Sequence, residues 1–380
     1  MSGQSGPGRA LTARFAGQTL PMVLRAGWDW QRGGHVERLD ADGQPLAAPY
    51  RRVMVHARQL HVFSAWAHRT GSQAFAEHAD RVFDYMVRHF HDRERGGWFA
   101  RIDQAGAVVD GDKRLYDHAF VLFGLSSYLA ALGRSDARRW IDETADLLEE
   151  RFSRPDGSFA ERMSERFDDR NPGLREQNPH MHLLEAALAL LEADGDARWR
   201  TLASRLLGLF HRGFLDRSRH VVREYLDAGF TPVANRGVRV EAGHHFEWAW
   251  LLERSARLLG DERSSRAAVP VLERGLELGW DRTAGGVFDE SDAGTGRVLV
   301  ATRRLWPACE LVKALVVNPA PARGPDLDQA VRLVAERYVT TDGRWTERFG
   351  PDWAPVDRTM PASSLYHLAM AIAELEDRSG

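Results

Sequence analysis

The sequence holds a single cysteine, Cys309, among 380 residues. One thiol cannot build an intramolecular disulfide framework, and it excludes a zinc site made of several thiolates. Lysine is almost as scarce, because Lys113 and Lys313 are the only two among 51 basic residues. We interpret the excess of arginine as a matter of genome composition and not as the mark of a binding site.

Neither positive charge nor long apolar runs dominate the chain. The formal net charge is −3, so no basic surplus exists for a phosphate backbone, and we expect no nucleic-acid partner. No uninterrupted apolar run reaches about 18 residues, so we expect no membrane span. The first residues lack the apolar core of a secretory signal. We therefore expect a cytoplasmic protein whose residues 1–9 form a disordered leader.

Several motifs that mark common active sites are also absent. The sequence has no GXXXXGKS/T, no GXGXXG after a strand and no GXSXG. Metal-ligand residue types occur together as His180 and His182 with Glu185, and as His244 and His245 with Glu247. The HEXXH spacing is missing, so this evidence is weak and we expect neither a metal nor an organic cofactor.

What the sequence does contain is an internal repeat. A short pattern of small residues, an aromatic or β-branched residue and alternating polar residues recurs six times, as in GGWFARIDQAG and GGVFDESDAGTG. Each copy predicts a short β-hairpin or extended loop. The copies lie about 62 residues apart and are anchored at Gly34, Gly97, Gly157, His220, Gly286 and Gly343.

Between the copies, apolar residues recur with the 3.6-residue period of helices. In most pairs the first helix is the more apolar, as expected of an inner ring wrapped by an amphipathic outer ring. The predicted helices span 53–69, 74–90, 115–132, 137–151, 181–192, 199–212, 244–259, 264–278, 306–316, 327–338 and 361–375. The pattern predicts an all-α fold, an (α/α)6 barrel of six inner and six outer helices with short β-hairpin loops. An open helical solenoid is the alternative. No linker interrupts the pattern, so residues 1–380 are expected to form one catalytic domain.

In such a barrel the starts of the inner helices meet at one mouth, where a pocket forms. Polar residues occupy positions there that apolar ones would otherwise fill. A lone buried histidine is more often structural than catalytic, but burying so many polar groups without a role would be costly. The candidates are Arg58, Tyr116, Asn178, His180, His182, Glu185, His244, His245, Glu247, Trp306, Glu310 and His367.

This set of side chains suits proton abstraction next to a carbonyl. Imidazole titrates near pH ~6.5 and can both take and return a proton. An arginine can donate to the developing oxyanion, and tryptophan can stack on a sugar ring. Glycoside hydrolysis would need two acids across one pocket, whereas histidines dominate here.

At these residues the chain resembles the N-acylglucosamine 2-epimerase superfamily, which includes mannose isomerases and cellobiose 2-epimerases. The resemblance rests on ARQLHVFSA, NPHMHLLEA, GHHFEWAWLL and SSLYHL, and it covers nearly the whole chain. It implies an (α/α)6 barrel with His244 and His367 as the acid/base pair. It further implies that Arg58 and His182 lie in the pocket and that Glu247 orients the imidazole of His244. Tyr116, Asn178 and Trp306 would line the sugar site.

The GHHFEWAWLL and MPASSLYHL segments look more like the mannose-isomerase branch. The resemblance therefore implies an isomerase that interconverts D-mannose and D-fructose, with D-lyxose and D-xylulose as a second pair, through a cis-enediol. A 2-epimerase of a free hexose, a disaccharide or an N-acylated hexosamine is the alternative, and a non-catalytic sugar-binding barrel is a third. The expected partner is a small monosaccharide, bound by a monomer or a homodimer.

Overall fold

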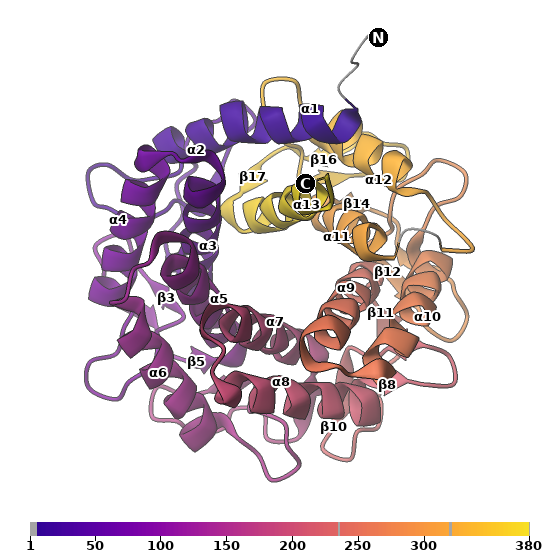
Figure 1. Ribbon diagram of the computed structural model, residues 1–380, viewed down its shortest axis with the longest axis horizontal. Helices are drawn as coiled ribbons and strands as arrows, with labels where there is room; N and C mark the ends of the chain where they lie inside the picture. Colours follow the sequence, from indigo (N-terminus) through magenta and orange to yellow (C-terminus); the bar gives the residue numbers. More distant parts are fainter. Residues whose placement is uncertain (1–5, 235, 319–320, 380) are drawn as a thin grey trace.

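Two concentric rings of helices surround one axis in the computed structural model, which describes residues 6–234, 236–318 and 321–379 (Figure 1). Among these residues, six helices form the inner ring: α3 Val53–Thr70, α5 Leu115–Leu132, α7 Gln177–Asp194, α9 Ala242–Leu259, α11 Leu305–Val317 and α13 Leu365–Ser379. A 3-10 turn, Ala362–Ser364, precedes α13. The inner helices are buried over most of their circumference, which explains why their sequences are more apolar.

The outer ring covers the inner one with amphipathic helices that bury a single face. Five of them are α4 Gln73–His89, α6 Ala137–Leu147, α8 Ala197–Leu209, α10 Glu262–Gly279 and α12 Leu327–Leu333. The sixth position is filled by α1 Pro7–Arg14 and α2 Leu20–Ala26. Four outer segments contain a π-helical turn: Phe15–Thr19, Leu148–Phe152, Phe210–Phe214 and Val334–Tyr338. The (α/α)6 barrel predicted from the repeat is confirmed.

The N-terminal segment differs from the expectation of a disordered leader over residues 1–9. Helix α1 begins at Pro7, so the expectation is wrong for residues 7–9, while residues 1–5 lie outside the described part. Proline suits the first turn of a helix because the N–H that it lacks would have no partner there. Arg14 then fixes the segment by donating to the carbonyls of Ala335 and Val339 at 3.0 and 3.1 Å.

The strands are short and lie at one end of the barrel. They are β1 Arg38–Leu39, β2 Arg51–Arg52, β3 Arg101–Ile102, β4 Val108–Asp110, β5 Lys113–Arg114, β6 Arg162–Met163, β7 Leu174–Glu176, β8 Leu215–Asp216, β9 Val221–Val222, β10 Tyr225–Asp227, β11 Arg239–Val240, β12 Glu290–Asp292, β13 Val298–Val300, β14 Arg303–Arg304, β15 Arg348–Phe349, β16 Pro355–Asp357 and β17 Met360–Pro361. Their antiparallel pairing follows one rule, since the strand that leads into an inner helix pairs with the hairpin of the next unit. The pairs are β2–β3, β5–β6, β7–β10, β11–β12, β14–β15 and β17–β1.

The last of these pairs closes the ring. Strand β17 precedes the final inner helix, whereas β1 belongs to the first hairpin, and Leu39 pairs with Met360. Helix α1 packs against α12 and α13 at the same junction, where both ends of the described chain lie (Figure 1). The open solenoid is therefore excluded, because the first and last units join as neighbouring units do.

Four histidines fasten the hairpins to the first turns of the inner helices. In each, Nε2 accepts a backbone N–H from a hairpin at 2.9–3.2 Å, while Nδ1 donates to the carbonyl four residues earlier. Burial lowers their pKa values to about 3 or 4, so they are neutral. They are His56, His118, His180 and His245. The candidates His180 and His245 therefore have both ring nitrogens engaged in structural hydrogen bonds.

Helix α5 is long and apolar enough to cross a membrane by length and composition alone. Of the 18-residue window that passes this test, 67% is buried inside the barrel. A helix that is mostly buried in the core of a protein passes the same test of length and composition.

Replacing His180 with alanine should lower the free energy of unfolding without abolishing activity. The backbone N–H of Phe159 would lose its 2.9 Å acceptor, and an unsatisfied buried donor costs about 1–3 kcal/mol. Urea unfolding measures the loss, with exposed His68→Ala on α3 as the control that should change stability by less than about 0.5 kcal/mol. Full stability with lost catalysis would contradict the structural role of His180.

Candidate functional site

A cavity of about 290 Å³ opens where the inner helices begin. All six inner helices or the turns that precede them contribute side chains to it. All eight residues predicted for the sugar site line it: Arg58, Tyr116, Asn178, His182, His244, Glu247, Trp306 and His367. Six further lining residues did not emerge from the sequence: Glu241, Arg304, Glu347, Arg348, Ser363 and Ser364. The repeat thus brings together at one mouth residues that lie up to about 310 positions apart.

Three histidines of the cavity share one arrangement, in which a glutamate holds Nδ1. His244 Nδ1 lies 2.9 Å from Glu224 Oε2, and His367 Nδ1 lies 2.7 Å from Glu310 Oε1. On helix α7, His182 Nδ1 lies 3.0 Å from Oε2 of Glu185. Within the described residues the hydrogen bonds of these three histidines involve Nδ1 and not Nε2. Each imidazole is oriented from behind and presents Nε2 for chemistry.

The expectation that Glu247 orients His244 is wrong. Glu224 takes this role, since both of its carboxylate oxygens lie within 3.0 Å of His244 Nδ1. Glu247 lies one turn further along α9, where its Oε1 is 3.7 Å from Nδ1 of His182. Glu224 lies in the segment between β9 and β10, and it also accepts the backbone N–H of Glu241, the residue that precedes α9.

The repeat itself contained the signal that points to Glu224. An acidic residue stands three or four positions after the anchor in five of the six copies: Glu37, Glu161, Glu224, Asp289 and Glu347. The first four accept the backbone N–H of the residue that precedes an inner helix, at 2.8–3.1 Å. Each thereby satisfies the backbone N–H of an N-cap residue, as an N3 glutamate does in a capping box. Glu224 is the one that also holds a histidine of the cavity.

Arg58 and Trp306 are placed to contact a ligand between the histidines. Arg58 donates from Nη2 to the Tyr116 hydroxyl at 2.7 Å and from Nη1 to the carbonyl of Ser363 at 2.9 Å. The Trp306 ring centroid lies 5.1 Å from that of His244 and 5.6 Å from that of His367. Oδ1 of Asn178 is buried without a partner, so it can accept a ligand hydroxyl.

Comparison with known proteins shows the family of the chain. Residues 34–371 match the family described as N-acylglucosamine 2-epimerase. The chain belongs to this family. It is 32% identical over 382 residues to a protein named mannose-6-phosphate isomerase from Rhizobium meliloti, covering 94% of each chain. It is 29% identical to a D-mannose isomerase from Thermobifida fusca, covering 83% of this chain and 82% of that one.

The fold has solved counterparts. The cellobiose 2-epimerase from Bacillus thermoamylovorans superposes with a TM-score of 0.88 at 17% identity, over 98% of this chain and 99% of that one. At this identity the likeness concerns the barrel alone. The family match and the sequence relatives place the chain among sugar isomerases and epimerases.

The two predicted catalytic histidines differ in protonation. Burial lowers the pKa of His244, but the Glu224 carboxylate outweighs this and raises it to about 9. For His367, burial together with the charges of Arg58 and Lys313 holds the pKa well below its ordinary value. At neutral pH His244 is therefore an imidazolium and His367 a neutral imidazole. An acid and a base lie on either side of Trp306.

Beneath the cavity, a buried layer of carboxylates could hold a cation. Ligating atoms within 4.8 Å of one another come from His182, Glu185 and Glu247, and again from Glu247, Glu310 and His367. The ammonium of Lys313 already lies 2.7 Å from Glu310 Oε2. A divalent ion there would be placed against a fixed positive charge, so we assign no metal to this layer.

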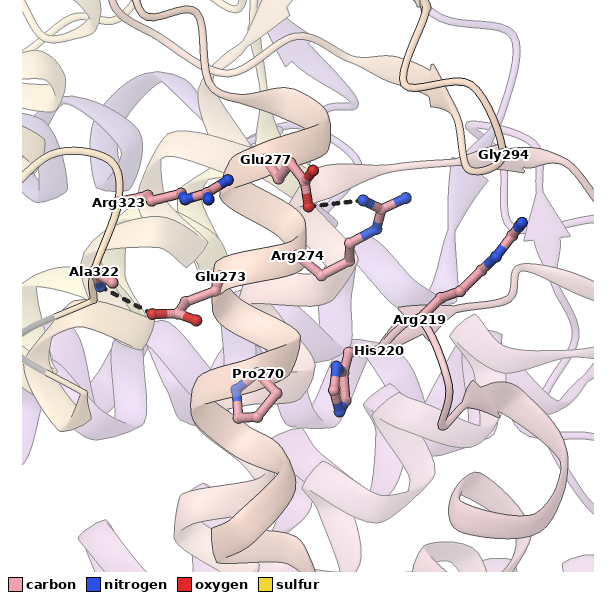
Figure 2. A pocket seen from close by; sticks show the side chains of 9 residues that line it. All are labelled: Arg219, His220, Pro270, Glu273, Arg274, Glu277, Gly294, Ala322 and Arg323. Carbon is pink, nitrogen blue, oxygen red and sulfur yellow. Dashed lines mark hydrogen bonds and ion pairs between the residues drawn. The ribbon is translucent and has the colours of Figure 1, made fainter.

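A larger cavity of about 700 Å³ lies outside the barrel, against α10 (Figure 2). Arg274 is paired with Glu277 at 2.7 Å, and Glu273 accepts the backbone N–H of Ala322 at 2.9 Å. It contains none of the predicted site residues, and its carboxylates already have partners. We therefore take the smaller cavity at the inner-helix starts as the candidate site.

Replacing Glu224 with glutamine should lower the pKa of His244 below its ordinary value of about 6.5, because burial remains and the balancing carboxylate is gone. Titration of ¹⁵N-labelled histidine by NMR measures this change. In the native protein the raised pKa stabilises the fold fully below pH ~6.5, and this contribution disappears as the pH rises through about 9. The stability difference between the two proteins should shrink over that range.

The matched control is Glu37→Gln, which removes the acid at the same place in the repeat. Glu37 pairs with Arg52 and contacts no histidine of the cavity, so His244 should titrate as in the native protein. An unchanged His244 titration in Glu224→Gln would contradict the electrostatic role of Glu224.

Proposed function

We propose that the protein is an aldose–ketose isomerase that interconverts D-mannose and D-fructose, with D-lyxose and D-xylulose as a second substrate pair. The observation that carries this proposal is the pair of histidines in one cavity, one neutral and one protonated, each held by a glutamate through Nδ1. The residues 1–380 would act as one catalytic domain, as a monomer or homodimer in the cytoplasm.

In the proposed reaction, His367 Nε2 removes the proton from C2 of the open-chain aldose. The electrons move toward the C1 carbonyl and form a cis-enediol, and the same imidazolium returns the proton to C1, which yields the ketose. His244, being protonated, assists ring opening and moves protons between the oxygens at C1 and C2. The proton count balances, because the proton lost from C2 is gained at C1.

The remaining residues would bind the sugar and stabilise charge. Arg58 can donate to the oxygen that becomes negative as the enediol forms. Trp306 offers an apolar face for the C–H side of the sugar, between the two histidines. Asn178, Tyr116 and His182 add hydrogen-bond partners for hydroxyl groups.

The charge of the cavity favours an unphosphorylated substrate. Three arginines and three glutamates line it, and the positive charge of His244 is balanced by Glu224 directly behind the ring, so no large positive surplus is left for a phosphate dianion. Arg304 in particular is bound by Asp289 and Glu241 at 2.8 and 2.7 Å. The relative from Rhizobium meliloti carries the name mannose-6-phosphate isomerase, and phosphorylated sugars therefore belong in the substrate screen.

A 2-epimerase is the second candidate, because the protonated His244 could return the proton to C2 from the opposite face. The two reactions are separated by incubating the purified enzyme with free and phosphorylated aldoses in deuterated water and identifying the products. We expect fructose from mannose, and no turnover of the phosphorylated sugars. A C2-inverted aldose would identify an epimerase, and binding without turnover would identify a non-catalytic barrel.

Treatment with a chelator should leave the rate unchanged; loss of activity restored by zinc or manganese would overturn the metal-independent mechanism.

The roles of the two histidines can be tested separately. His367→Ala should abolish both turnover and exchange of the C2 proton with solvent, since removing a general base costs about 10²–10⁴-fold. His244→Ala should lose turnover on the cyclic sugar but retain slow C2 exchange in the open-chain form, because His367 remains. The two rates are measured by product assay and by NMR detection of deuterium at C2.

His61→Ala is the control for these variants. His61 is buried, and its Nδ1 lies 2.7 Å from the Ser127 hydroxyl, in a second cavity that does not include the candidate site residues. It should affect packing and stability only. Native exchange in His367→Ala together with lost exchange in His244→Ala would reverse the two roles.

A further inference from the structure

One of the two lysines of the chain lies directly behind the candidate base. The Lys313 side chain has no exposed surface, and its Nζ is 2.7 Å from Glu310 Oε2 and 3.9 Å from the centroid of the Trp250 ring. The other oxygen of the same carboxylate, Oε1, accepts from His367 Nδ1 at 2.7 Å. A continuous contact therefore runs from Lys313 through Glu310 to the imidazole at the cavity.

Burying an ammonium group costs several kcal/mol unless a partner compensates it. Lys113 shows the structural form of such a pair, since it is equally buried and lies 2.9 Å from Asp92. In two other units an arginine makes the equivalent contact, as Arg51 does with Asp29 and Arg303 with Asp281. Lys313 belongs to no such series. It is the cation placed among three buried carboxylates beneath the cavity.

We infer that Lys313 is a positioning residue that keeps Glu310 ionised, so that Glu310 accepts the Nδ1–H of His367 and leaves Nε2 unprotonated for the sugar. This inference rests on the proposed function for the role of His367, but not for the protonation state itself. A carboxylate can only accept a hydrogen bond, so an ionised Glu310 permits one tautomer of the neutral imidazole. A protonated Glu310 could donate to Nδ1 and would permit the other.

The groups that face Lys313 and Glu310 indicate what happens without the ammonium. They are Glu185 and His182 from α7, Glu247 from α9, His367 and Glu374 from α13, and Arg58 from α3. Carboxylates prevail in this layer. Burial raises the pKa of Glu310 above its ordinary value, and Lys313, at 2.7 Å, is the positive charge that opposes this rise most strongly. Without it, one proton is taken up from solvent, either by Glu310 or by His367. An imidazolium carries a proton on Nε2. A carboxylic O–H is a stronger donor than the imidazole N–H, so a neutral Glu310 donates to Nδ1 and the ring proton moves to Nε2. In both cases Nε2 of His367 is lost as a base.

The experiment reads the tautomer directly. Histidine labelled with ¹⁵N distinguishes protonated from unprotonated ring nitrogens by NMR, in the native protein, in Lys313→Met and in the control Lys113→Met. At pH 7 the native protein and the control should show His367 with Nδ1 protonated and Nε2 free. Lys313→Met should show Nε2 protonated. An unprotonated Nε2 in Lys313→Met would overturn the inference whether or not any sugar is turned over.

Steady-state kinetics give a second test, because a purely structural role of Lys313 would not produce the changes described next. Lys313→Met should lower kcat by about 10–100-fold, less than removal of the base itself, with KM within about twofold of native. Where the imidazole has taken the proton, the acid limb of the kcat profile should move to higher pH. Adding Glu310→Gln to Lys313→Met should restore much of kcat, because the amide has no acidic proton to pass to Nδ1 and its oxygen, the stronger hydrogen-bonding group, accepts from Nδ1–H without a buried charge. Failure of this rescue, with the double variant folded, would overturn the inference.

Should Lys313→Met fail to fold, Lys313→Gln makes the same test. Its amide can donate to Glu310 without supplying charge, so the inference requires the same protonation of Nε2. A native tautomer and native kcat in Lys313→Gln would show that charge at this position does not set the state of His367.

Discussion

The contact between each hairpin and the first turn of an inner helix is the constraint on which the candidate site depends. No side chain caps the N-termini of the long inner helices α3, α5, α7 and α9, so their free backbone groups need partners from elsewhere. Hairpin acids such as Glu37 and Glu161 accept the N–H of the N-cap residue, and histidines such as His56 and His118 bind the hairpins to the first turns of the helices. The helix starts are thereby held at defined positions around one mouth, and a cavity with fixed side chains results.

Some side chains of this structural framework also belong to the candidate site. Glu224 belongs to the series of hairpin acids, yet it also holds His244, and that contact makes the imidazole an acid at neutral pH. On helix α7, His180 fastens a hairpin while His182 lines the cavity. Two residues correspond to about 200° around a helix, so alternate histidines face the outside and the axis. Structural and reactive side chains can therefore stand side by side in the sequence.

Much of the architecture could be predicted from the sequence because the repeat is regular. Six hairpins at even spacing with helix pairs between them leave few other closed arrangements, and the inner helices then begin around one mouth. Which of the polar residues at these starts face the mouth, as His182 does, and which bind a hairpin, as His180 does, depends on the position around the helix. The N-terminal outer helix was not recognised, because Pro7 and the glycines around it resemble an irregular segment. Glu224 was assigned no role because it reaches His244 across a hairpin, whereas Glu247 is a neighbour by helical spacing. Arg304 and Arg348 lie on strands whose orientation depends on pairing with distant hairpins.

Closure of the ring has a consequence for how the chain reaches its native state. The pair between β1 and β17 joins positions about 320 residues apart, and it neighbours the helix that carries His367. Pairing over such a distance is slow, since the loss of chain entropy precedes the gain of contacts. During synthesis the ring stays incomplete until the last helix, α13, is made. Until then the faces of α3 and α11 that pack against α13 are uncovered. The candidate cavity is thus among the last features to form, and an incompletely folded chain would hold most of the barrel without the helix that carries His367.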